Sequence, residues 1–275
     1  MNVTLPVHTN LKRLYHYQGS DIDRLRTIIC DRLLYFSNPA QFNDPWDCKP
    51  FFSPPDLSNS SAMESHLIWY AENTRRHRRD VSEEQILKRL IELRNSPLQF
   101  RAIIENEINT AMSTMISDRF RIYCLSALPD QELMWAHYAS KHSGVCLEFA
   151  TENEDFCGAI KVLYSSDLPF YDLISDNEEN NIGPLISKSA AWSYEEEYRA
   201  FALEGLQPFK HMMLTTNNSH RKLLDGTLRA VILGCLVNES LVHSIRALIE
   251  QSGQSIQLKR AIRIKNKYQL AITDA

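Results

Sequence analysis

The spacing of apolar residues changes twice along this chain, and that change constrains the fold more than any other feature. From about residue 62 to residue 119, apolar side chains such as Ile104, Ile108, Met112 and Met115 recur at intervals of three and four, the period of a helix with one buried face. On both sides of this block, short runs alternate in the way that is typical of β-strands. We therefore predict a single α+β domain over residues 1–275, with a mixed or antiparallel sheet core and a helical insertion at residues 62–119.

The same periodicity and the capping residues place the other elements. Strands are expected at residues 12–17, 32–37, 121–128, 144–150, 160–165, 195–203, 210–215, 228–233, 256–264 and 268–272. Helices are expected at residues 21–30 after a Ser20 cap, at 130–141, at 185–191 and at 239–251 after an Asn238 cap. Two segments rich in polar and turn-forming residues, 38–48 and 166–181, are expected to be loops.

Composition narrows the functional class. With 275 residues, of which 44% are hydrophobic, the chain can bury a sizeable core, and its net charge of −4 gives no overall attraction to nucleic acid or anionic membranes. No run approaches the roughly 18 apolar residues that span a bilayer, and residues 1–10 do not resemble a signal peptide. The six cysteines have no paired spacing. We expect a cytoplasmic protein with reduced cysteines and no membrane contact, and the oligomeric state stays open.

The segment from Trp192 to Leu203 carries the strongest chemical pattern. In an extended strand, Glu195, Glu197 and Arg199 would lie on one face, because side chains alternate between the two faces. Two carboxylates beside a guanidinium can perform acid/base chemistry or stabilise a developing cation. The competing interpretation is a solvated edge strand with an ion pair.

Four segments of this chain combine polar and aromatic residues in an unusual density. Burying their polar groups without partners would be costly, so we expect the segments to meet around one cleft. They are residues 15–17, 42–47, 135–138 and 192–199. The sequence contains no phosphate-binding glycine loop, no zinc-binding His-Glu-x-x-His helix and no Gly-x-Ser-x-Gly elbow.

These segments also support a family resemblance. The chain resembles the bacterial family called domain of unknown function 2971, with motifs that match in order and spacing over nearly the whole chain. The motifs are Leu14-Tyr-His-Tyr17, Leu34-Tyr-Phe-Ser-Asn-Pro-Ala-Gln-Phe-Asn-Asp-Pro-Trp-Asp47, Leu133-Met-Trp-Ala-His-Tyr-Ala139 with Gly144-Val-Cys-Leu-Glu-Phe149, and Trp192-Ser-Tyr-Glu-Glu-Glu-Tyr-Arg199. The family name implies no activity.

A weaker resemblance is to the ADP-ribosyltransferases, whose split-sheet fold carries an Arg or His on an early strand, a Ser or Tyr in the middle and a Glu late. This chain offers His16 or Arg13, then Ser126 or Tyr138, then Glu197. It departs from that family in its long helical insertion and in lacking a clear Ser-Thr-Ser strand. The resemblance implies an NAD-consuming transferase, such as a toxin or defence effector, that modifies a protein or nucleic-acid acceptor.

The ADP-ribosyltransferase resemblance also implies a role for each candidate residue. Breaking the bond between nicotinamide and ribose develops oxocarbenium charge, which a carboxylate stabilises. Glu197 would be the principal catalytic residue and bind the ribose, Glu195 would meet the acceptor, and His16 would hold the ribose on the adenosine side. The remaining candidates for contacting NAD are Tyr17, Phe42, Asn43, Trp46, Ser126, Trp135 and Tyr138.

Two other classes of function stay open. A metal-dependent nuclease would gather Asp44, Asp47, Glu195 and Glu197 around Mg²⁺. A non-catalytic interaction module would bury the aromatic residues in its core and use the helical insertion as a docking surface. Whether the polar and aromatic segments converge on an open cleft discriminates between these interpretations.

Overall fold

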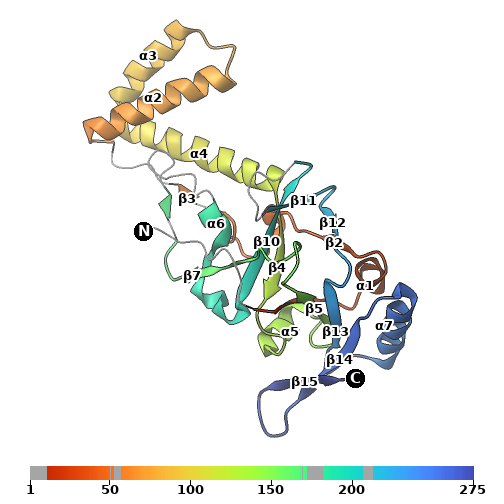
Figure 1. Cartoon of the computed structure of the whole chain (residues 1–275). Coiled ribbons are helices and arrows are strands. Elements are labelled where there is room, and N and C mark those ends of the chain that lie inside the picture. The colour runs from red at the N-terminus through yellow and green to blue at the C-terminus, as the bar shows by residue number, and fades with distance from the viewer. Residues whose placement is uncertain (1–10, 50, 53–56, 169, 172–181, 207–212) are drawn as a thin grey trace.

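The computed structural model describes residues 11–49, 51–52, 57–168, 170–171, 182–206 and 213–275 (Figure 1). Within them, a sheet of nine strands forms the centre of the molecule, in the order β11-β10-β4-β1-β5-β13-β14-β15, with β6 beside β10. The strands are β1 Arg13–Gln18, β4 Phe120–Ser126, β5 Val145–Ala150, β6 Ile160–Lys161, β10 Glu197–Glu204, β11 Met213–Thr216, β13 Leu228–Leu233, β14 Gln257–Arg263 and β15 Leu270–Asp274. The β10–β11 and β13–β14 pairs are parallel and the other pairs are antiparallel. The predicted α+β class with a mixed sheet is confirmed.

The large sheet is nearly divided between β1 and β4. Six register pairs join β1 to β5, whereas Tyr15 and Ser126 form the one register pair that joins β1 to β4 within the described residues. Since the two strands separate beyond this pair, the backbone hydrogen bonds of a continuous ladder are missing there. Instead, the His16 ring bonds the carbonyl oxygen of Cys124 at 2.8 Å. The sheet therefore has two halves, one containing β4 and β10 and the other containing β1 and β5.

Two helices cover one part of the sheet. α1 (Ile22–Ile29) and α7 (Glu239–Ser252) lie beside each other at the right of Figure 1. Both bury apolar side chains, such as Leu25 and Ile245, in the main hydrophobic core. Asn238 caps α7 as predicted, whereas α1 is capped by Asp21 and not by Ser20, because the Asp21 carboxylate accepts hydrogen bonds from the backbone N–H groups of Asp23 and Arg24.

The predicted helical insertion is confirmed, and it starts two residues earlier than expected. It consists of α2 (Ser60–His77), α3 (Glu83–Arg94) and α4 (Pro97–Arg119). Ser82 and Gln85 form a capping box at the start of α3, and Pro97 occupies the first turn of α4. The insertion has its own hydrophobic cluster, which includes Leu67, Leu93 and Phe100. Figure 1 shows α2 and α3 projecting away from the sheet, with α4 leading back to it.

Two further local predictions were wrong. The strand predicted at residues 160–165 is two short strands, β6 and β7 (Leu163–Ser165). The helix predicted at residues 185–191 is a single turn, α6 (Gly183–Ile186), followed by β9 (Ser187–Ser189) and a 3₁₀ segment at Ala190–Glu195. β7 pairs with β9, so tertiary pairing overrides the local helical pattern.

The remaining elements are short. α5 (Glu132–Tyr138) follows β4, and a 3₁₀ turn (Pro39–Gln41) lies inside the predicted loop at residues 38–48. Two further strand pairs are β2 (Leu33–Tyr35) with β12 (His220–Lys222) and β3 (Phe51–Phe52) with β8 (Phe170–Tyr171). Most of the loop predicted at residues 166–181, and the start of the strand predicted at 210–215, lie outside the described residues. None of the described helices has the length and apolar character needed to cross a membrane.

Candidate functional site

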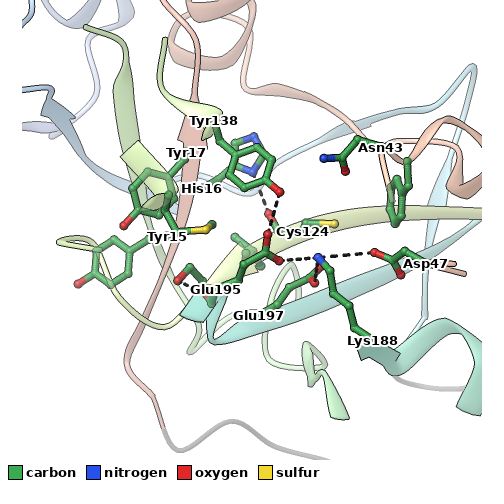
Figure 2. Close-up of a pocket in the computed structure, with 14 residues that line it drawn as sticks. Tyr15, His16, Tyr17, Asn43, Asp47, Cys124, Tyr138, Lys188, Glu195 and Glu197 are labelled. Carbon is green, nitrogen blue, oxygen red and sulfur yellow. Dashed lines mark hydrogen bonds and ion pairs between the residues drawn. The ribbon is translucent and has the colours of Figure 1, made fainter. Parts of the chain in front are cut away.

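A cavity of about 150 Å³ lies where β1 and β4 separate (Figure 2). A cavity of this size holds roughly one six-membered ring. Its lining combines four aromatic rings and a histidine with three carboxylates and a lysine, a mixture that suits a small ligand with both apolar and polar parts. The lining residues are Tyr15, His16, Tyr17, Phe42, Asn43, Asp47, Cys124, Leu125, Ser126, Met134, Tyr138, Lys188, Glu195 and Glu197.

Each of the four segments expected to meet around a cleft contributes to this lining. β1 supplies Tyr15 to Tyr17, the loop after β2 supplies Phe42, Asn43 and Asp47, and α5 supplies Tyr138. Glu195 and Glu197 come from the segment that leads into β10. The structure adds Lys188 of β9, whose side chain is almost fully buried and which no sequence pattern marks as special.

The alternation predicted that Glu195 and Glu197 lie on one face of a single strand, and this prediction was wrong. Glu195 ends the 3₁₀ segment, Glu196 is left-handed with φ 43° and ψ 49°, and Glu197 begins β10. The backbone turn at Glu196 nevertheless directs both neighbouring carboxylates to the same ammonium group. The Nζ atom of Lys188 lies 2.5 Å from Oε2 of Glu195 and 3.0 Å from Oε2 of Glu197.

A second cation completes the cluster. The guanidinium of Arg199 is fully buried and donates to both carboxylate oxygens of Glu197, at 2.8 and 3.0 Å, and to Oδ2 of Asp47 at 2.7 Å. Lys188 lies 3.6 Å from the same Asp47 oxygen. Three carboxylates therefore share two cations, which leaves one negative charge. Arg199 contacts Glu197 and Asp47, whereas Lys188 contacts all three carboxylates and is the cation that pairs with Glu195, so the excess charge belongs to the cluster as a whole.

The two glutamates have pKa shifts of opposite direction. Burial would raise the pKa of Glu197, but Arg199 and Lys188 outweigh it and lower this pKa to about 2. Burial raises the pKa of Glu195 above its usual value, because Lys188 offsets only part of that effect and Glu197 adds repulsion. Burial would lower the pKa of Lys188, but Glu197, Glu195 and Asp47 together raise it. When two neighbouring carboxylates have pKa values shifted in opposite directions, the one with the raised pKa is suited to exchange protons. In this site that residue is Glu195.

Two hydroxyl groups fix Glu195 in place. Tyr138 donates its hydroxyl to Oε1 of the Glu195 side chain at 2.8 Å. Ser126 donates to the backbone carbonyl of Glu195 at 2.7 Å and accepts from the backbone N–H of Leu128 at 3.2 Å. Ser126 therefore lines the cavity but acts mainly on the backbone that carries Glu195.

His16 is neutral near pH 7. Its Nδ1 atom must be the donor to the Cys124 carbonyl, since a carbonyl oxygen only accepts, and the ring stacks on Tyr123 with centroids 4.4 Å apart. Burial lowers the pKa of His16 to about 4. The ring lines the cavity and also has a hydrogen bond with the Gln18 side chain. Tyr17 also lines the cavity, but its hydroxyl donates to the carbonyl of Leu128 at 2.7 Å.

Trp135 does not fit the role that the sequence suggested. The side chain is fully buried, its indole N–H donates to the Pro129 carbonyl at 2.8 Å, and it packs edge-on against Tyr17. It is absent from the cavity lining, so the prediction that it contacts a ligand was wrong. Phe42 and Asn43 do line the cavity, whereas Trp46 is 65% exposed and lines a separate cavity on the other side of Asp47 and Lys188.

The carboxylates of the alternative magnesium site do not surround an open position. The ammonium of Lys188 occupies the centre of Asp47, Glu195 and Glu197, and Asp44 instead accepts the backbone N–H of Trp46 at 2.9 Å. Among the described residues, no group of three or more His, Cys, Asp or Glu side chains is placed to hold a metal ion. This donor set does not fit Mg²⁺, which prefers oxygen ligands and several waters.

Comparison with known families adds one finding. The model of a family described as "Protein of unknown function (DUF2971)" matches residues 134–200. The predicted resemblance to this family is confirmed over residues 134–200, and the motifs quoted from earlier parts of the chain stay a prediction. The DUF2971 segment carries Tyr138, Lys188, Glu195, Glu197 and Arg199, whereas His16 and Asp47 lie before it. No curated protein and no solved structure matches the chain, so these comparisons do not bear on the ADP-ribosyltransferase resemblance.

Proposed function

We propose that this protein is an ADP-ribosyltransferase-like enzyme that binds NAD at the cavity between β1 and β4 and cleaves its nicotinamide–ribose bond. The observation that carries the proposal is the charge of the buried cluster. Asp47, Glu195 and Glu197 outnumber Lys188 and Arg199 by one, and Glu195 faces the cavity. A fixed negative charge in a buried site favours a reaction that develops positive charge on the substrate.

The proposed reaction needs no group beyond the substrates. As the bond between ribose C1′ and the nicotinamide nitrogen breaks, its electron pair leaves with nicotinamide and neutralises the pyridinium ring. The ribose becomes oxocarbenium-like, and the Glu195 carboxylate stabilises it as in glycoside hydrolysis. An acceptor nucleophile then forms a bond to C1′ and its proton passes to Glu195, whose raised pKa suits it to take up a proton.

The size and lining of the cavity agree with one ring of such a substrate. About 150 Å³ accommodates nicotinamide or ribose but not the whole dinucleotide, so the adenosine half would lie outside. Tyr15 and Phe42 provide apolar surface for a flat ring. The neutral His16 ring also lines the cavity, where a ribose hydroxyl would contact it.

The contacts favour Glu195 over Glu197 as the principal catalytic residue. Arg199 bonds both carboxylate oxygens of Glu197, and Lys188 bonds one of them as well, so this side chain has little capacity left for a ligand. Glu195 has one donor on each oxygen and can accept further hydrogen bonds. Glu197 would then act by holding Lys188 and Arg199 beside Glu195.

The test is release of nicotinamide from NAD by the purified protein, with and without cell extract as a source of protein and nucleic-acid acceptors. Glu195→Gln keeps the shape and removes the charge, so release should fall by about 100-fold or more. Glu196→Gln is the matched control, because Glu196 is half-buried and pairs with Lys161 at 2.9 Å instead of the cluster. No release under any condition would reject the proposal, and nucleic-acid cleavage that EDTA abolishes would favour the nuclease.

Two cellular consequences belong to the same proposal. Expression of an NAD-consuming toxin or defence effector in the cytoplasm should lower cellular NAD and arrest growth, while the Glu195→Gln protein should do neither. Transfer of labelled ADP-ribose to protein or to nucleic acid in extract would identify the class of acceptor.

A further inference from the structure

The helical insertion leaves a set of large apolar side chains uncovered. α2 and α3 are joined by the short loop at residues 78–82 and pack as an antiparallel hairpin. On this hairpin, Ile68 is 58% exposed, Leu87 57% and Ile91 64%. Contiguous apolar surface on a projecting element often marks an interaction site.

Two ion pairs show how these side chains lie relative to one another. Glu64 of α2 pairs with Arg94 of α3 at 2.7 Å, and Arg75 of α2 pairs with Glu83 of α3 at 2.8 Å. Ile68 is one helical turn from Glu64, and Ile91 is one turn from Arg94, so the first ion pair places Ile68 beside Ile91. We call this surface the hairpin face: Glu64, Ile68 and Arg75 of α2 with Glu83, Leu87, Ile91 and Arg94 of α3.

The four ion-paired charges at the two ends of the hairpin face alternate, and one more exposed charge, Glu72 of α2, lies one turn from Ile68. One end carries Glu64 on α2 and Arg94 on α3, and the other end carries Arg75 on α2 and Glu83 on α3. Turning the face over about an axis along the helices brings Glu64 of one copy over Arg94 of the other, and Arg75 over Glu83. Turning it about an axis across the helices brings Glu64 over Arg75, and Glu83 over Arg94. The pattern of these four charges is therefore complementary to itself under either two-fold rotation.

We propose that the hairpin face binds a second copy of this chain. Ile68, Leu87 and Ile91 of each copy would form the dry centre of the interface, and the four ion-pairing side chains would form its charged rim. Two hairpins packed in this way make a four-helix arrangement, in which apolar faces of antiparallel helices are normally buried. Charge complementarity favours a second copy over an unrelated partner. An unrelated partner would not require the acidic and basic residues to exchange helices between the two ends of the face. The inference does not depend on the proposed function, because the hairpin projects away from the sheet that holds the cavity (Figure 1).

The first experiment measures molar mass by light scattering across a concentration series of the full chain. Wild-type protein should approach twice the monomer mass, and Leu87→Gln/Ile91→Gln should weaken association by about 100-fold or more, because it removes most of the apolar centre. Leu236→Gln is the matched control, since Leu236 is also 57% exposed but lies outside the insertion. Wild-type protein that stays monomeric at every concentration, or a double variant that associates as wild type does, would overturn the proposal.

A charge experiment tests self-complementarity directly. Arg75→Glu/Arg94→Glu makes all four ion-pairing positions of the hairpin face acidic, and Glu64→Arg/Glu83→Arg makes all four basic. Exposed ion pairs contribute about 0–1 kcal/mol each, so both variants should fold, which helical circular dichroism checks. Each variant alone should be monomeric, and the equimolar mixture should regain the wild-type dimer mass. Association of either variant alone at wild-type strength, or a mixture that stays monomeric, would contradict docking of a second copy on this face.

Discussion

Glu195 and Glu197 lie two residues apart, belong to different secondary-structure elements, and direct their carboxylates to the same ammonium group of Lys188, at 2.5 and 3.0 Å. The left-handed conformation of Glu196 makes this convergence possible. Glu197 is then neutralised by Arg199, while Glu195 faces the cavity. Two chemically similar residues therefore have different environments.

Replacing Lys188 with Met should destabilise the fold strongly. The substitution leaves Asp47, Glu195 and Glu197 with one cation between them, and removing one partner from a buried ionic cluster costs about 3–5 kcal/mol. Urea denaturation would measure the change in the free energy of unfolding. Lys161→Met is the matched control, since its pair with Glu196 is partly exposed and should contribute less than about 1 kcal/mol. Equal effects of the two substitutions would contradict the charge balance described for the cluster.

Replacing Tyr138 with Phe should raise the pKa of Glu195 further. The Tyr138 hydroxyl donates to Oε1 of Glu195 and so favours the ionised carboxylate, which lowers its pKa. Without that donor, Glu195 would bind a proton at higher pH. Carbon NMR of ¹³C-labelled glutamate side chains would follow the titration, and any limb of a pH–activity profile that reports Glu195 should move to higher pH. A titration that moves to lower pH would show that another donor replaces the hydroxyl.

The stability of the fold should depend on pH through His16. Its pKa is lowered from 6.5 to about 4 by burial. Above pH 6.5, His16 is neutral in both the folded and the unfolded chain and contributes no pH dependence. Between pH 6.5 and 4, the unfolded chain binds a proton that the folded chain does not, so stability falls as the pH falls. At about 1.4 kcal/mol for each pH unit, the loss would reach at most about 3.5 kcal/mol, and less where solvent reaches the ring.

The His16→Gln protein provides the comparison for that measurement. The difference in unfolding free energy between pH 7 and pH 4.5 should be smaller in this variant than in the wild type. Guanidinium denaturation at several pH values gives both curves. Parallel curves for the two proteins would mean that His16 keeps an ordinary pKa in the folded chain.

Trp135 and Trp46 should respond differently to replacement with alanine. Trp135 is fully buried and bonded to the Pro129 carbonyl, so Trp135→Ala should cost about 3–5 kcal/mol of stability. Trp46 is 65% exposed, and Trp46→Ala should change stability by about 0.5 kcal/mol. Thermal denaturation compares the two, and a small effect at Trp135 would contradict its role as a core residue.

The sequence by itself determined the helices whose signals come from residues close together in the chain. The three helices of the insertion follow from apolar spacing, the Ser82 capping box and Pro97, and α7 follows from its Asn238 cap. These signals act over one or two helical turns, so they can be read without a partner segment. The sequence also indicated which polar and aromatic segments would line the cavity, because side chains of that kind are costly to bury alone.

Only the tertiary structure decided the role of each residue. Lys188 lies on a three-residue strand that exists because β7 pairs with it, so its burial among three carboxylates has no local signal. Trp135 and Trp46 are both tryptophans in polar and aromatic segments, yet one is core and the other is exposed. The different environments of Glu195 and Glu197 likewise depend on the turn at Glu196 and on the hydrogen bond from Ser126 to the Glu195 carbonyl. That hydrogen bond joins residues about 70 apart in sequence. Contacts between distant segments fix burial, charge balance and pKa, and these are the quantities on which the chemistry of the cavity depends.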